Sequence, residues 1–421
     1  MENTFYDVII VGAGHAGLCT SFYLTKGGIK HIVFEQGRIG ETWRSQRWDS
    51  FKMNSANKLN LLPEQTKYFD DPDSFSFANE FASSLDNYVK QFNLSVVEDS
   101  RVVEVKRIES KNIFTVMVLM NKVKSHFECK QLVIASGGQN KLVIPEFSKN
   151  IASHILQLHS SEYRNVNQLL DGNILIVGSA QSGIQIAEDL VRENRKVFLS
   201  TGMVGRIPRR YRGKDIYDWL FELGFYDVFT EDVMDLSLFK SKNPQVSGWG
   251  ERGKTCSLQS LSRKGVSILG RVDKADSNTV FIQPNAISHV LFADDFSKNV
   301  KVLIDDYIRN YNIEAALPEI DNDDIPDLTA SCVEDISMLH LSEHNIKTII
   351  WATGLIGDFN FLQLPVLSKS KIPKHHNGIS DVKGLYFIGL PWLRKKKSSL
   401  IPGISDDAGF IVQQIIDSIS N

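Results

Sequence analysis

The chain has 421 residues, of which 42% are hydrophobic and 23% are charged, and its formal net charge is −3. This composition is typical of a globular protein, and the length predicts two domains or more. The charge balance argues against a nucleic-acid partner. Since no run of about 18 apolar residues occurs, the sequence also predicts no membrane span.

Residues 1–10 carry no basic segment before their apolar run, so we expect no secretory signal. The cysteines, Cys19, Cys129, Cys256 and Cys332, are far apart and form no Cys-x-x-Cys pair. This usage fits a reducing compartment, and we expect a cytoplasmic protein with buried thiols.

A glycine-rich turn follows the apolar run at 8–11 and precedes an amphipathic run that ends near residue 26. Gly12, Gly14 and Gly17 have G-x-G-x-x-G spacing. The first glycine permits a tight turn, the second lets backbone approach a pyrophosphate, and the third lets the helix pack on the strand. The alternative is that these glycines serve the tight turn alone.

A second apolar run, at 31–34, ends on Glu35, whose carboxylate can accept hydrogen bonds from ribose hydroxyls. The whole stretch therefore predicts strand, turn, helix and strand, with a dinucleotide on the helix N-terminus. We expect its contacts at Gly12, Gly14, His15, Ala16, Gly17, Glu35 and Gln36.

The chain from 36 to 134 holds one long irregular connection and then a change of pattern. Residues 36–63 are a candidate functional loop because they are long for a connection. The pattern predicts a helix over 76–93. Alternation at 102–105, 113–119 and 126–129 then predicts three antiparallel strands. A buried strand at 132–135 runs into Gly137 and is expected to rejoin the first sheet.

The opening pattern recurs after a polar linker at 140–171. An apolar strand at 173–177 precedes a glycine turn with Ala180 in the middle position, then a helix at 184–192 and a strand at 196–199. This strand ends without an acid, and the arginines that follow could pair with a 2′-phosphate, which favours NADPH; a solvated basic loop is the alternative. The expected contacts are Gly178, Ala180, Gln181, Ser182, Gly183, Ser200 and Arg209.

The last part of the chain is expected to complete the first domain. We predict aromatic packing over 211–238, a helix over 299–311 and a solvated acidic loop at 319–327. A strand at 346–351 leads into Thr353 and Gly354, and Ser405 would cap a helix over 406–419. The predicted fold is α/β, with two Rossmann-like domains and an antiparallel β-meander. The second domain (166–340) is inserted into the first (1–165 and 341–421).

Two dinucleotide folds in tandem resemble the two-dinucleotide-binding flavoproteins, and short motifs resemble the flavin-containing monooxygenase and Baeyer–Villiger group. Residues 40–43 resemble the G-G-T-W element, 349–354 the A-T-G strand end, and 159–163 the second half of F-x-G-x-x-x-H-S-x-x-Y. Residues 50–55 resemble the segment with an active-site asparagine, which makes Asn54 the candidate. The chain departs from the group at Ser153 and Ile155, and at Gly202, where an Arg often stands.

The resemblance implies FAD in the first domain and NADPH in the second. It implies a monooxygenase acting with O₂, through a flavin C4a-hydroperoxide, on a nitrogen, sulfur or carbonyl carbon of a small organic substrate. Asn54 would donate hydrogen bonds there; alternatively it closes an Asx-turn. Further contacts are expected at Trp43, Gly137, Thr353, Gly354 and Asp406.

Other functions remain open on the sequence. A dehydrogenase or oxidase would move hydride without inserting oxygen, and a flavoprotein redox sensor would be no enzyme; a disulfide reductase would need a paired dithiol. Direct catalysis by His159 is less expected than a structural role. The basic run 394–397 could meet an acidic group or be a solvated loop, and no metal site is expected. A homo-oligomer is compatible with the sequence.

Overall fold

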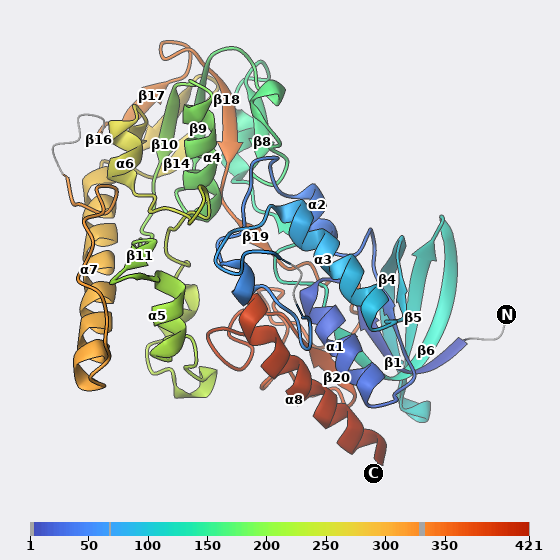
Figure 1. The fold of residues 1–421 in the computed structure, drawn as a ribbon. Helices are drawn as coiled ribbons and strands as arrows, with labels where there is room; N and C mark the ends of the chain where they lie inside the picture. Colours follow the sequence, from blue (N-terminus) through green and yellow to red (C-terminus); the bar gives the residue numbers. More distant parts are fainter. Residues whose placement is uncertain (1–3, 67–68, 328–332, 421) are drawn as a thin grey trace.

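The computed structural model describes residues 4–66, 69–327 and 333–420, so Cys332 lies outside the described residues. Two sheets organise the chain (Figure 1), the first at the lower right and the second above it. No helix in this part of the chain is long and apolar enough to cross a bilayer. The helices are α1 (His15–Lys26), α2 (Glu41–Ser45), α3 (Ala78–Gln91), α4 (Gln181–Arg192), α5 (Ile216–Glu222), α6 (Leu258–Arg263), α7 (Ala286–Asn310) and α8 (Ile401–Ser420).

The first sheet has the order β3-β2-β1-β6-β5-β4, and β20 pairs with the C-terminal half of β6. The strands around β1 are parallel, whereas β4, β5 and β6 pair antiparallel in succession. We expected separate strands at 126–129 and 132–135; they form one continuous strand. The bounds are β1 (Thr4–Val11), β2 (His31–Phe34), β3 (Val96–Val97), β4 (Ser100–Ile108), β5 (Ile113–Met120), β6 (Val123–Ile134) and β20 (Leu385–Phe387).

Both faces of β1 are buried, and alternate residues serve the two faces, as the pleat of a strand requires. Val8 and Ile10 pack in the cluster that includes α1, α3 and α8, whereas Ile9 and Val11 pack with β5 and the segment 359–393. Figure 1 shows α1, α3 and α8 together on one side of this sheet. The glycine turn after Val11 is therefore held by a strand that is buried on both sides.

The second sheet, β16-β13-β10-β9-β18-β8, is parallel throughout. The expectation that 346–351 returns to the first domain is wrong, because β18 pairs with β9 and β8. Boundaries at 165 and 340 would also leave β8 and β18 outside the sheet to which they belong. The bounds are β8 (Leu156–His159), β9 (Asn173–Val177), β10 (Val197–Ser200), β13 (Ser267–Leu269), β16 (Val333–Glu334) and β18 (Ile346–Trp351).

Small sheets and helices surround the second sheet. One face packs on α4, α6 and α7, and the other on a three-stranded antiparallel sheet. The aromatic segment after residue 211 packs α5 against α7, as expected for packing residues. The smaller strands are β7 (Lys141–Leu142) with β19 (Leu355–Ile356), β11 (Arg210–Tyr211) with β12 (Lys214–Asp215), and β14 (Val272–Ala275) with β15 (Thr279–Ile282) and β17 (Met338–His340).

Two helices begin earlier than predicted. Helix α7 begins at Ala286 rather than 299, and α8 begins at Ile401 rather than 406, so Ser405 lies inside α8. The loop 319–327 is not simply solvated either. Asp324 is buried and forms an ion pair with the buried Arg206, which also pairs with Asp294 of α7 at 2.7 Å. A buried arginine needs such partners because an unpaired charge is costly away from water.

Candidate functional site: two glycine turns and the loop between them

The first glycine turn is shaped by close backbone packing. Gly12 has φ +106°, and a Cβ at this position would lie 2.6 Å from the carbonyl oxygen of Ala135. A Cβ on Gly17 would collide with the carbonyl oxygen of Gly12. A Cβ on Gly14 would have no described atom within 4 Å, so open space adjoins the N-cap of α1. The turn therefore combines two packing glycines with one exposed stretch of backbone, the combination that lets a pyrophosphate approach a helix N-terminus.

The carboxylate of Glu35 lies beside this turn. It accepts hydrogen bonds from the backbone N–H of Ala13 at 2.7 Å and of Gly37 at 3.0 Å. Burial raises the pKa of Glu35, while these two hydrogen bonds act in the opposite direction. Gln36 is exposed next to it, and Ala16 is buried in the first turn of α1. Glu35 thus binds the backbone of the glycine turn from the end of β2, which is the position predicted for ribose recognition.

Two buried polar atoms at the first turn have no hydrogen-bond partner among the described residues. They are Nε2 of His15, in the first turn of α1, and Oγ of Ser136, just after β6. Burial lowers the pKa of His15 to about 4, so its imidazole is neutral at pH 7. Buried polar groups without a partner are uncommon because they cost free energy, and a polar ligand at the turn would supply partners. The open backbone at Gly14, the carboxylate of Glu35 and these two unpaired polar atoms together fit the polar groups of a dinucleotide.

The second turn repeats this geometry. Gly178 has φ +109° and leaves no room for a Cβ beside the carbonyl of Ala352, and a Cβ on Gly183 would meet the carbonyl of Gly178. Ala180 is the N-cap of α4 with φ −71° and ψ −172°, close to the values of Gly14 (−77° and −179°). A side chain is allowed at these angles, which explains why alanine can replace the middle glycine.

Several predicted contact residues surround the two turns. Gly137 follows β6 with φ +81° and Gly354 follows β18 with φ +96°, and open space adjoins both. Ser182 is half-buried in the first turn of α4, whereas the side chain of Gln181 is bound locally: it donates to the carbonyl of Pro244 and accepts from the N–H of Val246.

Asn54 contacts α4, the helix that follows the second glycine turn, and its side-chain orientation is fixed. Gln185 of α4 donates from Nε2 to Oδ1 of Asn54 at 2.6 Å and to the carbonyl of Val246 at 3.4 Å. Because the carbonyl can only accept, Nε2 of Gln185 is identified as the donor. Asn54 must then present its oxygen to Gln185, and Nδ2 remains directed elsewhere as a donor. The main-chain carbonyl of Asn54 accepts from Arg209 at 2.8 Å.

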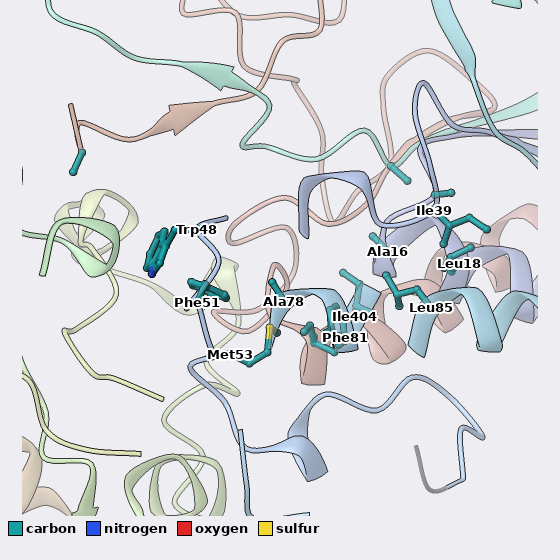
Figure 2. Close-up of a cluster of buried hydrophobic side chains, with 14 of the residues drawn as sticks. Ala16, Leu18, Ile39, Trp48, Phe51, Met53, Ala78, Phe81, Leu85 and Ile404 are labelled. Carbon is teal, nitrogen blue, oxygen red and sulfur yellow. The ribbon is translucent and has the colours of Figure 1, made fainter. Parts of the chain in front are cut away.

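The loop before Asn54 is anchored in the core of the first domain. Figure 2 shows Phe51 and Met53 pointing toward Ala78 and Phe81 of α3, with Trp48 beside Phe51. Trp43, predicted to contact the cofactor, is half-buried and packs edge-on against Phe81, with ring centroids 5.2 Å apart. Asn54 therefore joins a loop packed on the first domain to a helix of the second.

The structure speaks against the predicted role of Arg209 in binding a 2′-phosphate, because its guanidinium is buried against Asp215. The side chain is 2% exposed, forms an ion pair with Asp215 and lies over the ring of Phe75 at 4.5 Å. Its Nε donates to Asp215 at 2.7 Å. Arg209 is therefore neutralised locally, and its remaining hydrogen bond supports Asn54.

Two hydroxyl groups predicted to bind cofactors hold the protein chain instead. Ser200 donates to the carbonyl of Gly270 at 2.9 Å and accepts from the N–H of Val272 at 3.0 Å. Thr353 donates to the carbonyl of Val143. Both hydroxyls thus bond to main chain at the end of the second sheet, and their cofactor contacts stay predictions.

The basic run 394–397 forms intramolecular ion pairs, so it is neither a simple solvated loop nor a free anion site. Lys395 and Lys397 pair with Asp227 at 3.3 and 2.9 Å, and Lys397 also pairs with Asp406 at 2.9 Å. The carboxylate of Asp406 is thus occupied, and its predicted cofactor contact stays a prediction.

His159 and Tyr163 are structural in this structure. His159 is fully buried and hydrogen-bonds Ser161 and the carbonyl of Gly354, and the Tyr163 hydroxyl donates to Asp189 of α4 at 2.8 Å. Gln185 was not predicted from the sequence. The signal was its position one turn after Gln181 in a helix that follows a glycine motif, but its partner Asn54 is 131 residues away.

Comparisons with known proteins agree with this geometry. The family model described as pyridine nucleotide-disulphide oxidoreductase matches residues 9–208, just under half of the chain. A relative from Geobacillus kaustophilus described as an uncharacterized oxidoreductase CzcO-like is 28% identical, over 98% of each chain.

Two solved structures share the fold. One is the flavin-containing monooxygenase from Stenotrophomonas maltophilia, which has a TM-score of 0.66, 15% identity and 99% coverage of both chains. The other is OTEMO in complex with FAD and NADP, which has a TM-score of 0.58, 13% identity, and coverage of 100% of this chain and 87% of that one. The chain is thus similar to pyridine nucleotide-disulphide oxidoreductases over residues 9–208, and it shares the fold of a flavin-containing monooxygenase.

Proposed function

We propose that the protein is an FAD- and NADPH-dependent monooxygenase that acts with O₂ on a small organic substrate through nitrogen, sulfur or Baeyer–Villiger oxygenation. The observation that carries this proposal is a pair of glycine turns of the same geometry on different sheets, together with Asn54, whose side chain Gln185 holds on the helix after the second turn. The relatives named above support it, since one is described as an oxidoreductase and one as a flavin-containing monooxygenase.

FAD would lie on the first turn. The backbone at Gly14 would approach the pyrophosphate, Glu35 would face the ribose, and the unpaired atoms of His15 and Ser136 would gain partners there. NADPH would lie on the second turn, at Gly178 and Ala180. When bound, FAD would supply acceptance of hydride from NADPH and the oxygen chemistry that the oxygenation of a substrate needs.

The residues of this chain would provide orientation and a dry environment. Asn54 would donate from Nδ2 toward the flavin or the nicotinamide, because Gln185 already occupies its oxygen. The loop that leads to Asn54 contains three buried apolar residues, Trp48, Phe51 and Met53. Exclusion of water and satisfied hydrogen bonds are the two conditions that keep a reactive oxygen species from decomposing. We assign no acid–base pair to this chemistry.

The alternative function is an FAD-dependent NAD(P)H dehydrogenase or oxidase that inserts no oxygen, because the same two sites would serve it. A thiol-based reaction is not favoured. Cys19, Cys129 and Cys256 are buried, and burial raises the pKa of each thiol, whereas reactive cysteines need a lowered pKa.

NADPH oxidation measured together with hydrogen peroxide release tests the proposal over a set of small amines, sulfides and ketones. A monooxygenase consumes NADPH with little peroxide in the presence of its substrate, since the oxygen enters the product. Stoichiometric peroxide with every compound would favour the oxidase alternative. A purified protein that binds no FAD would refute both.

A further inference from the structure

We propose that Arg271 binds the 2′-phosphate of NADPH and so sets the preference for NADPH over NADH; the inference rests on the proposed nucleotide site on the second sheet. Since Arg209 is buried against Asp215, the cation for a 2′-phosphate must come from elsewhere. Arg271 follows β13, the parallel neighbour of β10, and its side chain is exposed.

The geometry of the strand ends places Arg271 where the phosphate of a nucleotide on α4 would lie. In a dinucleotide-binding fold the adenosine ribose lies at the end of the second strand, which is β10 in this domain. Ser200 of β10 pairs with Leu269 of β13, so both strands end at the same edge. The N–H of Gly202 donates to Oγ of Ser179 at 3.1 Å, which joins this edge to the glycine turn.

The space beside this edge is open. A Cβ on Gly202 would have no atom of the described residues within 4 Å, and Gly202 does not need a positive φ. Gly202, the second residue after β10, thus offers no side chain to the nucleotide, and the hydroxyl of Thr201 is bonded to Leu269, so a charge from the neighbouring strand end can take that role. Arginine suits the role because its planar guanidinium can bind a phosphate through two parallel hydrogen bonds.

The main chain of Arg271 is fixed while its guanidinium remains available. The N–H of Arg271 donates to Oδ1 of Asn285 at 3.0 Å, and its carbonyl accepts from the N–H of Gln283 at 2.8 Å. Among the described residues no carboxylate forms an ion pair with its guanidinium within 4.0 Å. A fixed main chain reduces the conformational entropy lost when a phosphate is bound.

His289 completes the surroundings of the guanidinium. Its Nδ1 lies 2.9 Å from Oγ1 of Thr201, next to the end of β10. Burial lowers the pKa of His289, the charge of Arg271 lowers it further, and Asp335 acts in the opposite direction. Asp335 is engaged with the N–H of Ala286 at 3.0 Å. With His289 neutral at pH 7, Arg271 supplies the positive charge at this edge.

Calorimetric titration of the full-length FAD-loaded protein with adenosine 2′,5′-bisphosphate and with AMP tests the proposal without turnover. Arg271→Ala should weaken the binding of the bisphosphate by about ten- to a hundredfold, the range for charged hydrogen bonds. The affinity for AMP should stay unchanged. The matched control is Arg309→Ala, in the last turn of α7, where the arginine pairs with Asp306 at 2.9 Å; both affinities should stay at the wild-type value.

A second variant tests the position of the phosphate. Gly202→Arg in the Arg271→Ala background places a guanidinium in the open space and should restore the preference for the bisphosphate. Equal loss of both ligands in Arg271→Ala, or no loss at all, would overturn the inference while leaving the proposed function standing. A wild-type protein that binds neither the bisphosphate nor NADP⁺ would instead overturn the proposed function itself.

Discussion

Gln185 donates a hydrogen bond of 2.6 Å to Oδ1 of Asn54 and so ties a helix of the second domain to a loop of the first. The two residues are 131 positions apart in the chain. Arg209, also from the second domain, binds the main-chain carbonyl of the same asparagine. These contacts give Asn54 a fixed orientation beside the helix that follows the second glycine turn, and the first prediction below follows from that arrangement.

Removal of the Gln185 contact should release the Asn54 amide without unfolding the protein. Gln185→Met has a similar volume but no donor, so Asn54 can rotate and its Nδ2 donor is no longer held. We expect more hydrogen peroxide per NADPH consumed, with a result close to that of Asn54→Ala. The double variant Gln185→Met/Asn54→Ala should release no more peroxide per NADPH than either single variant, because both substitutions remove the same hydrogen bond. Additive leakage would show that the two residues act separately.

Replacement of Arg209 should affect stability rather than nucleotide choice. Arg209→Met leaves the buried carboxylate of Asp215 without its ion pair, and breaking a buried pair from one side costs about 3–5 kcal/mol of the free energy of unfolding. Urea denaturation measures this loss, and the Arg209→Met/Asp215→Leu variant should recover much of it.

The selectivity control for Arg209 is the ratio of NADPH and NADH KM values. This ratio should remain at the wild-type value in Arg209→Met. A selective rise in the NADPH KM, with the free energy of unfolding unchanged, would restore the role in phosphate binding that the buried position of Arg209 contradicts.

Gly12 and Gly14 should respond differently to the same small change. Gly12→Ala places a Cβ 2.6 Å from the carbonyl of Ala135 at φ +106°, so the turn must distort and FAD should be lost. Gly14→Ala puts the methyl group into open space at an allowed φ of −77°, and the melting temperature should stay near wild type. Circular dichroism and the flavin-to-protein absorbance ratio check both. A Gly12→Ala protein that purifies with full flavin would contradict the account of this turn.

His15 should make the protein less stable in mild acid. Burial lowers its pKa to about 4, below the ordinary value of 6.5, so between these values the unfolded chain binds a proton that the folded protein does not. The contribution of neutral His15 to the free energy of unfolding is therefore complete above pH 6.5. It is lost as the pH falls toward 4, by at most about 1.4 kcal/mol per pH unit. His15→Asn should remove this slope from the urea-denaturation data, whereas replacement of the exposed His376 should not. An unchanged slope in His15→Asn would contradict a buried, neutral imidazole.

Local features of the fold were predictable from the sequence, and non-local pairings were not. The glycine turns follow from steric rules over a few residues, and Gly12, Gly17, Gly178 and Gly183 pack as those rules require. The strand at 346–351 was assigned to the wrong sheet because a short apolar run has the same pattern in either sheet.

The candidate site shows the same division. Asn54 is a candidate through its local motif and stays a prediction, and its partner Gln185 lies 131 residues away on α4. Arg209 was one of four arginines in a short basic stretch, and only its pairing with Asp215 in the folded chain distinguishes it from an exposed cation. The availability of Arg271 likewise depends on two strands ending at one edge, which no spacing in the sequence reveals.

The most direct test of the monooxygenase proposal is stopped-flow absorbance after the NADPH-reduced enzyme is mixed with O₂. The proposal predicts a transient that absorbs in the violet and decays to oxidised flavin, with a longer lifetime in wild type than in Asn54→Ala. Direct return of oxidised flavin without that transient, in wild type and variant alike, would contradict oxygen insertion and leave the oxidase alternative.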